Sequence, residues 1–82
     1  MSEKQIAELI ERLIDKTLAD RIQAKNPVTK GINAAFINGK IMGLISILDT
    51  FDDPADFVRV YEKYKPIIEA DNEVIETLYH KN

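Results

Sequence analysis

The hydrophobic positions of this 82-residue chain recur with the spacing of α-helices, and the first stretch shows this most clearly. Ser2 and Gln5 have the form of a capping box, in which each side chain bonds a backbone N–H that the helix start leaves unpaired. An apolar stripe follows, with polar residues on the opposite face. The pattern predicts a helix of about six turns that ends at Asn26-Pro27, since a residue before proline is pushed out of the α region. The stripe contains Ile6, Ile10, Ile14, Leu18 and Ile22, widened by Leu9 and Leu13.

The stretch from Pro27 to Thr50 is predicted to form a second helix. Asn26 is expected to cap it, with Pro27 as the first helical residue, where the missing N–H is not needed. Asn38-Gly39 between apolar runs is also typical of a β-hairpin turn. The flanking residues, however, do not alternate between apolar and polar as a half-buried strand would. A helix is the favoured interpretation, and a hairpin at Asn38-Gly39 is the alternative.

The second helix is apolar around its whole circumference, so it requires neighbours on every side. Ala35, Gly39 and Gly43 form a row of small residues that allows another backbone to approach, within the chain or across a dimer. Such a contact gives a reason for glycines that each cost about 1 kcal/mol relative to alanine in a helix. Three helices in one short chain cannot cover every side, so we expect a homodimer. Its interface is predicted to contain Ala35, Gly39, Gly43, Phe36, Met42 and Ile47.

The last third of the chain has helical spacing from Pro54 onward, with a proline inside the pattern. The preceding residues resemble a helix stop followed by a new N-cap at Asp53. Pro66 removes one backbone hydrogen bond and clashes with the preceding turn, so the helix is expected to kink or split there. Asp71 is a second candidate break, since its side chain is able to cap a terminal helix.

Together these segments predict an all-α fold in one domain covering residues 1–82. The arrangement has three helices, the third kinked or split near Pro66, in a bundle completed by homodimerisation. Hydrophobic residues make up 45% of the chain and charged residues 30%, which is ordinary for a globular protein. A domain of this size buries only about 60% of the surface of its unfolded chain. There are no cysteines to supply disulfides or thiolate metal sites, so extra stabilisation must come from association.

The excess of acidic residues is concentrated at the carboxyl end, where residues 51–82 hold eight acids and four bases in a chain of net charge −3. This balance makes duplex nucleic acid a poor partner, because phosphate binding depends on clustered Lys and Arg. Arg59, Lys63 and Lys65 alternate with Tyr61 and Tyr64, which is one form of a basic-aromatic patch. The favoured interpretation is a solvated helix face beside core tyrosines, because nearby acids dilute the patch.

One segment approaches membrane length, since Gly31–Leu48 is eighteen residues with Lys40 as its only charge. A lysine near the centre of a membrane helix costs about 2.5–3.5 kcal/mol on insertion scales. We therefore expect a buried core helix and no membrane partner. The amino-terminal residues MSEKQ lack the basic and apolar regions of a signal peptide, and the expected location is the cytoplasm.

Candidate chemistry is sparse in this sequence. Asp49, Asp52, Asp53 and Asp56 carry the oxygen ligands that Mg²⁺ or Ca²⁺ takes, but their spacing does not match the calcium loop. Capping the third helix is the favoured role of Asp53 and Asp56, because negative charge is favourable at a helix amino terminus. No convergent set of polar groups is visible, so we expect no catalysis, no cofactor and no metal.

These observations lead to a functional expectation that involves binding alone. The sequence favours a small intracellular helical protein-interaction module that forms a homodimer and presents a helical surface to another protein. The alternative is an acidic helical inhibitor of a nucleic-acid enzyme, of the kind that accompanies mobile elements, acting through the acidic last third.

Overall fold

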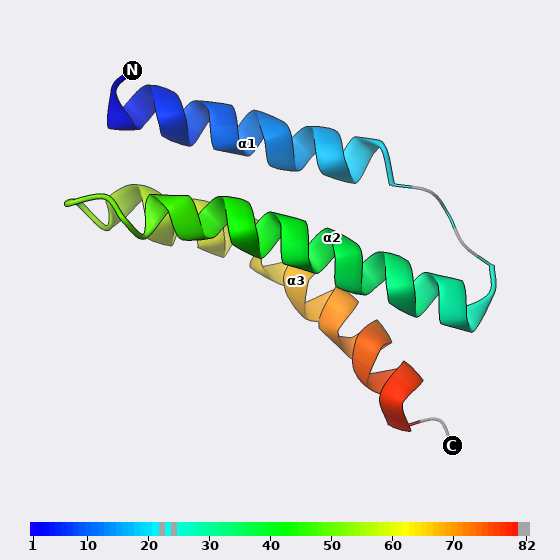
Figure 1. Ribbon diagram of the computed structural model, residues 1–82. Coiled ribbons are helices and arrows are strands. Elements are labelled where there is room, and N and C mark those ends of the chain that lie inside the picture. The colour runs from blue at the N-terminus through cyan, green and yellow to red at the C-terminus, as the bar shows by residue number, and fades with distance from the viewer. Residues whose placement is uncertain (22, 24, 81–82) are drawn as a thin grey trace.

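The chain folds into three α-helices that follow one another along the sequence (Figure 1). The computed structural model describes residues 1–21, 23 and 25–80. The helices are α1 (Glu3–Ala19), α2 (Pro27–Leu48) and α3 (Ala55–His80). No strand occurs among the described residues, so the all-α, three-helix prediction is confirmed. Asn38-Gly39 lies inside α2, and the hairpin alternative is therefore wrong.

The predicted helix starts are confirmed by their hydrogen bonds. At α1, the Ser2 backbone N–H donates to Gln5 Oε1 at 2.9 Å, and the Gln5 N–H donates to Ser2 Oγ at 3.2 Å. At α2, Asn26 Oδ1 accepts from the N–H of Val28 at 2.8 Å, and Pro27 occupies the first turn. Each side chain satisfies a donor that the helix itself leaves free.

The end of α1 differs from the prediction, because the helix stops at Ala19 rather than at Asn26-Pro27. Just beyond this end, the guanidinium of Arg21 binds the carboxylate of Asp71 on α3 through two hydrogen bonds, of 3.0 and 2.5 Å. This two-point bond holds the chain against α3, and the backbone leaves the helical path before it. Ile22, which the apolar pattern included, lies outside the described residues.

α3 is one continuous helix with Pro66 inside it, so the last element is not split. Figure 1 shows α3 changing direction between its yellow and orange parts, which is the kink expected of an internal proline. The predicted cap at Asp53 is present, since its Oδ1 accepts from the N–H of Ala55 at 2.9 Å. The predicted break at Asp71 is wrong, because this residue lies inside α3 and is buried against Arg21.

α2 lies between the other two helices and packs on both, with α1 on one side and α3 behind it in Figure 1. Its buried residues recur at three- and four-residue intervals, which defines an inner face. The inner face meets the apolar stripe of α1 and the amino-terminal half of α3. The buried apolar core consists of Ala7, Ile10, Ile14, Ile37, Ile41, Ile45, Leu48, Val60, Tyr64 and Ile68.

Polar contacts fasten α1 to α3 at the edge of this core. The hydroxyl of Tyr64 donates to Asp15 Oδ1 at 2.5 Å, and burial together with this bond raises the pKa of Tyr64 above its usual value. Arg59 and Lys63 both pair with Glu11 on α1. Two of the three basic residues of the basic-aromatic pattern, Arg59 and Lys63, are thus bound to an acid of the same chain, and Tyr64 belongs to the core.

The carboxyl-terminal half of α3 is held to α2 by fewer apolar contacts than the amino-terminal half. Asn38 interrupts the inner face of α2, and its Nδ2 donates to the carbonyl of Ile68 at 3.1 Å and to Asn72 Oδ1 at 2.9 Å. Farther out, Gly31 is buried against Leu78, where an added Cβ would lie 2.5 Å from Leu78 Cδ2. The helices therefore approach closely at Gly31 because it has no side chain.

Candidate interaction surface

The side of α2 that faces away from the core is a continuous apolar surface, which we call the outer face. Its three most exposed large hydrophobic residues are Phe36, Ile32 and Val28, with 69%, 59% and 55% of their surface accessible. A soluble monomer exposes single apolar residues routinely, but a contiguous row of them marks an interaction surface. The outer face consists of Val28, Ile32, Ala35, Phe36, Gly39, Met42, Gly43, Ser46 and Ile47.

All six residues of the predicted dimer interface lie on this face. Phe36, Met42 and Ile47 are 69%, 39% and 45% exposed, and the row of Ala35, Gly39 and Gly43 is also exposed. The structure therefore brings together the residues that the sequence grouped.

Among the described residues, the two glycines of the row have no close neighbour outside their own helix. A Cβ placed on Gly39 or Gly43 would meet no heavy atom within 4 Å beyond its own helix and the adjacent residues, among the atoms described. The possibility that this row packs closely inside the chain is therefore wrong, and the glycine that does so is Gly31. The row is free to receive a helix from outside.

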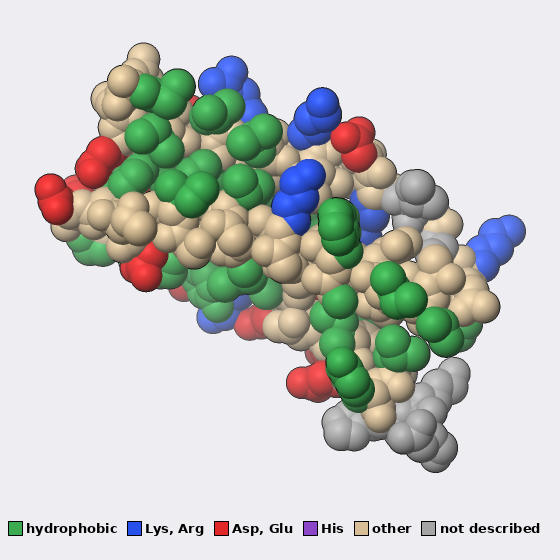
Figure 2. Space-filling view, viewed as in Figure 1, with side chains coloured by type: hydrophobic (Ala, Val, Ile, Leu, Met, Phe, Trp, Pro, Cys, Tyr) green, Lys and Arg blue, Asp and Glu red, His purple; other side chains and the backbone are tan. Residues whose placement is uncertain are grey.

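A groove between α1 and α2 extends the outer face. Its cavity volume is about 230 Å³, and its walls include Leu13 of α1 and Phe36 and Leu44 of α2. Leu13 is 41% exposed beside it, and Leu9, one turn earlier on α1, is 37% exposed; both belong to the apolar stripe predicted for α1. Figure 2 shows the hydrophobic side chains gathered over α1 and α2 on this side of the molecule. The apolar stripe of α1 is wider than one neighbouring helix can cover. This width was the sequence signal that Leu9 and Leu13 would remain partly exposed.

Electrostatically, the outer face is neutral. α2 contains two lysines and no acid along its whole length. Lys40 lies at the edge, where it lines the groove with Lys16, and Lys30 is near the helix start. The polar Ser46 donates its hydroxyl hydrogen to the carbonyl of Gly43 at 2.6 Å, so its donor is used within the helix. An uncharged surface of this kind loses little free energy on desolvation.

No group of three His, Cys, Asp or Glu side chains gathers for a metal within the described part of the chain. Asp53 and Asp56 stand instead at the start of α3. α2 is the one described helix long and apolar enough to cross a membrane, and 39% of an apolar eighteen-residue stretch within it is buried in the fold. Core helices of soluble proteins have the same length and composition.

Comparison with models of protein families, with curated proteins and with solved structures finds no match for this chain.

Proposed function

We propose that this protein is a small helical interaction module that acts as a homodimer, with the outer face of α2 as the dimer contact. The observation that carries the proposal is the pair of open glycines among exposed large apolar residues. Gly39 and Gly43 have free space above them, and Phe36 and Ile47 stand beside them on the same face. The row and its neighbours thus offer both a shallow surface for a helix and side chains to pack against it.

A second copy of the chain is the partner that fits this chemistry. In a symmetric dimer the same patch meets itself, so a patch with charges of one sign would repel its copy. The central outer face carries no charge, and Lys40 is confined to its edge. Association would also cover the apolar area that a small three-helix chain leaves exposed. We propose that the dimer works in the cytoplasm and binds another protein, without catalysis.

Thermal unfolding across a wide range of protein concentrations tests this proposal. Because mass action favours the associated folded state, the melting temperature is expected to rise with concentration. Gly43→Leu, which places a large side chain on the open row, should flatten this dependence. Ala55→Leu at the start of α3 is a matched control, and it should keep the wild-type dependence. A melting temperature independent of concentration in the wild type would remove the dimer from the proposal.

The alternative function, an acidic inhibitor of a nucleic-acid enzyme, is favoured by one feature of α3. Glu69, Glu73 and Glu76 are all exposed and lie at four- and three-residue spacing, so they form an acidic stripe on one face. A second acidic group surrounds the start of the helix. Reversing the charges of Asp52, Asp53, Asp56 and Glu62 should abolish capture of an enzyme partner if this alternative holds. Unchanged capture would rule out a role for the acidic group at the helix start.

A further inference from the structure

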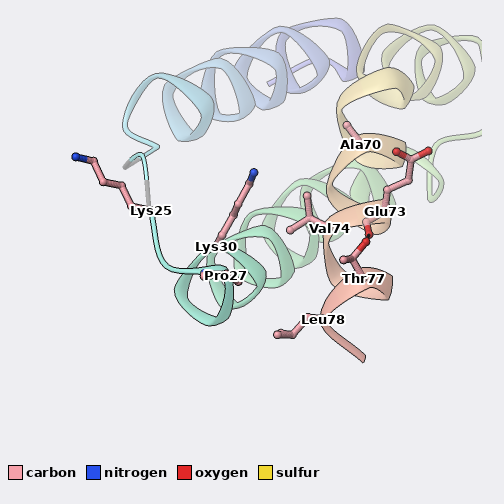
Figure 3. A pocket seen from close by; sticks show the side chains of 8 residues that line it. All are labelled: Lys25, Pro27, Lys30, Ala70, Glu73, Val74, Thr77 and Leu78. Carbon is pink, nitrogen blue, oxygen red and sulfur yellow. Dashed lines mark hydrogen bonds between the residues drawn. The ribbon is translucent and has the colours of Figure 1, made fainter. Parts of the chain in front are cut away.

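A second apolar surface lies at the other end of the molecule, between the start of α2 and the end of α3. We call it the distal cleft. Its cavity volume is about 420 Å³, and it is open to solvent along one side. Pro27 of α2 and Ala70, Val74 and Leu78 of α3 form its apolar walls (Figure 3). Val74 and Leu78 point from α3 toward α2 in this view.

The distal cleft exists because α1 is too short to cover it. α1 packs on α2 and α3 over the proximal part of the bundle and ends at Ala19. The described residues that line the cleft come from α2, α3 and the connection before α2, and none comes from α1. The seam between two helices that α1 covers at one end is therefore uncovered at the other. Such a seam accepts a helix, since two neighbouring helices present a groove between their side chains.

The two rims of the cleft carry opposite charge. Lys30 extends from α2 beside the opening, and Glu73 stands on the α3 side (Figure 3). Neither has an ion-pair partner within the described part of the chain. The hydroxyl of Thr77 donates to the Glu73 carbonyl at 2.8 Å, so it is already used within α3. Lys25, in the connection before α2, also lines the cleft. The binding groups that the cleft offers are thus an apolar floor, two lysines from α2 and the connection before it, and one glutamate from α3.

From this arrangement we propose that the distal cleft binds an amphipathic helix of another protein. The helix has an apolar stripe for the floor, acidic residues on the flank facing Lys30, and Lys or Arg on the flank facing Glu73. Small ligands are usually enclosed over 70–90% of their surface, which a cleft open along one side does not provide. A helix needs only its stripe buried, and its two charged flanks remain at the rims. This site is separate from the outer face of α2 and does not require the dimer.

Selection of helix-forming peptides from a displayed library on the full-length protein tests the proposal. The recovered peptides are expected to share an apolar stripe with acids on one flank and bases on the other. Ala70 is exposed within the cleft, so Ala70→Arg fills the site while sparing the core, and it should weaken binding about tenfold or more. Lys30→Glu should weaken binding about threefold, because a rim charge contributes little.

Two control variants separate the cleft from general effects. Ala55→Arg and Lys4→Glu make the same changes at exposed positions outside the cleft, and both should bind the peptides as the wild type does. Circular dichroism confirms that each variant is folded. The proposal is overturned if no peptide is enriched, if enriched peptides bind Ala70→Arg as well as the wild type, or if they lack opposite flanks. A variant that loses peptide binding and still dimerises, or that loses the dimer and still binds peptide, distinguishes this proposal from the proposed function.

Discussion

The two faces of α2 have the same kind of residues and opposite environments. On the inner face, Ile41, Ile45 and Leu48 are completely buried. On the outer face, Phe36 and Ile47 are 69% and 45% exposed. Composition therefore does not distinguish the two faces, and only packing does. The difference indicates that the chain's own helices satisfy half of α2, and that the other half is available to a partner.

The largest expected effect separates the faces by stability. Ile41→Ala should lower the free energy of unfolding by about 2–5 kcal/mol, because it leaves a cavity in a fully packed core. Ile47→Ala should change it by less than about 0.5 kcal/mol in dilute protein, where the outer face is solvated. Urea denaturation at low protein concentration measures both. Equal losses would mean that the outer face is packed within the chain, contrary to the comparison.

A smaller effect is expected on association. Gly43→Leu should weaken the dimer by about 1–3 kcal/mol, because a large side chain on the open row holds the helices apart. Its effect on the isolated chain should be slight, since the position has free space around it. Urea denaturation at two protein concentrations distinguishes the two effects. A loss that is the same at both concentrations would place the contact inside one chain.

The smallest effect compares two glycines of the same helix. In dilute protein, Gly43→Ala should stabilise the chain by roughly 0.5–1 kcal/mol, because alanine loses less backbone entropy and meets no neighbour. Gly31→Ala should give no such gain, since its Cβ would overlap Leu78 and force that side chain to move. Thermal unfolding of the two variants side by side measures the difference. Stabilisation by both to the same extent would show that the Gly31–Leu78 contact is loose.

Local signals in the sequence predicted most of the fold. Ser2 and Asn26 are capping residues, and the bonds that make them so lie within three residues of them. The lack of apolar–polar alternation on either side of Asn38-Gly39 correctly favoured a helix over a hairpin. Pro66 correctly predicted a bend. Each of these features is decided by residues close together in the chain.

The errors concern contacts between residues far apart in the chain. Aspartate is a common residue at helix caps, which made Asp71 a candidate break. Asp71 instead lies inside the unbroken α3, and its carboxylate binds Arg21, fifty positions earlier in the chain. α1 ends at Ala19, just before Arg21, the partner of Asp71. Which glycine meets another helix was also undecidable from spacing, since Gly31 and Gly43 lie in the same apolar helix. The distal cleft was missed because it depends on where α1 stops.

The prediction of the interaction surface was likewise correct where local spacing decides and incomplete where contacts between helices decide. Helical spacing alone placed Ala35, Gly39 and Gly43 in one row and set Phe36 beside them, and the structure shows them together on the outer face. Leu9 and Leu13 were placed in the apolar stripe of α1, and the structure leaves them 37% and 41% exposed. Whether a stripe is covered depends on the width of the opposing helices, which no local pattern records.

Sedimentation equilibrium of the wild type and of Phe36→Glu is the most direct test of the claim that the outer face of α2 binds a second copy. Phe36 is the most exposed large hydrophobic residue of that face, so the substitution leaves the core intact while placing a charge in the contact. The wild type is expected to sediment as a dimer at high concentration, and Phe36→Glu as a monomer with unchanged helix content. A wild type that remains monomeric at the highest concentration reached, or a Phe36→Glu variant that dimerises as strongly, would contradict the claim.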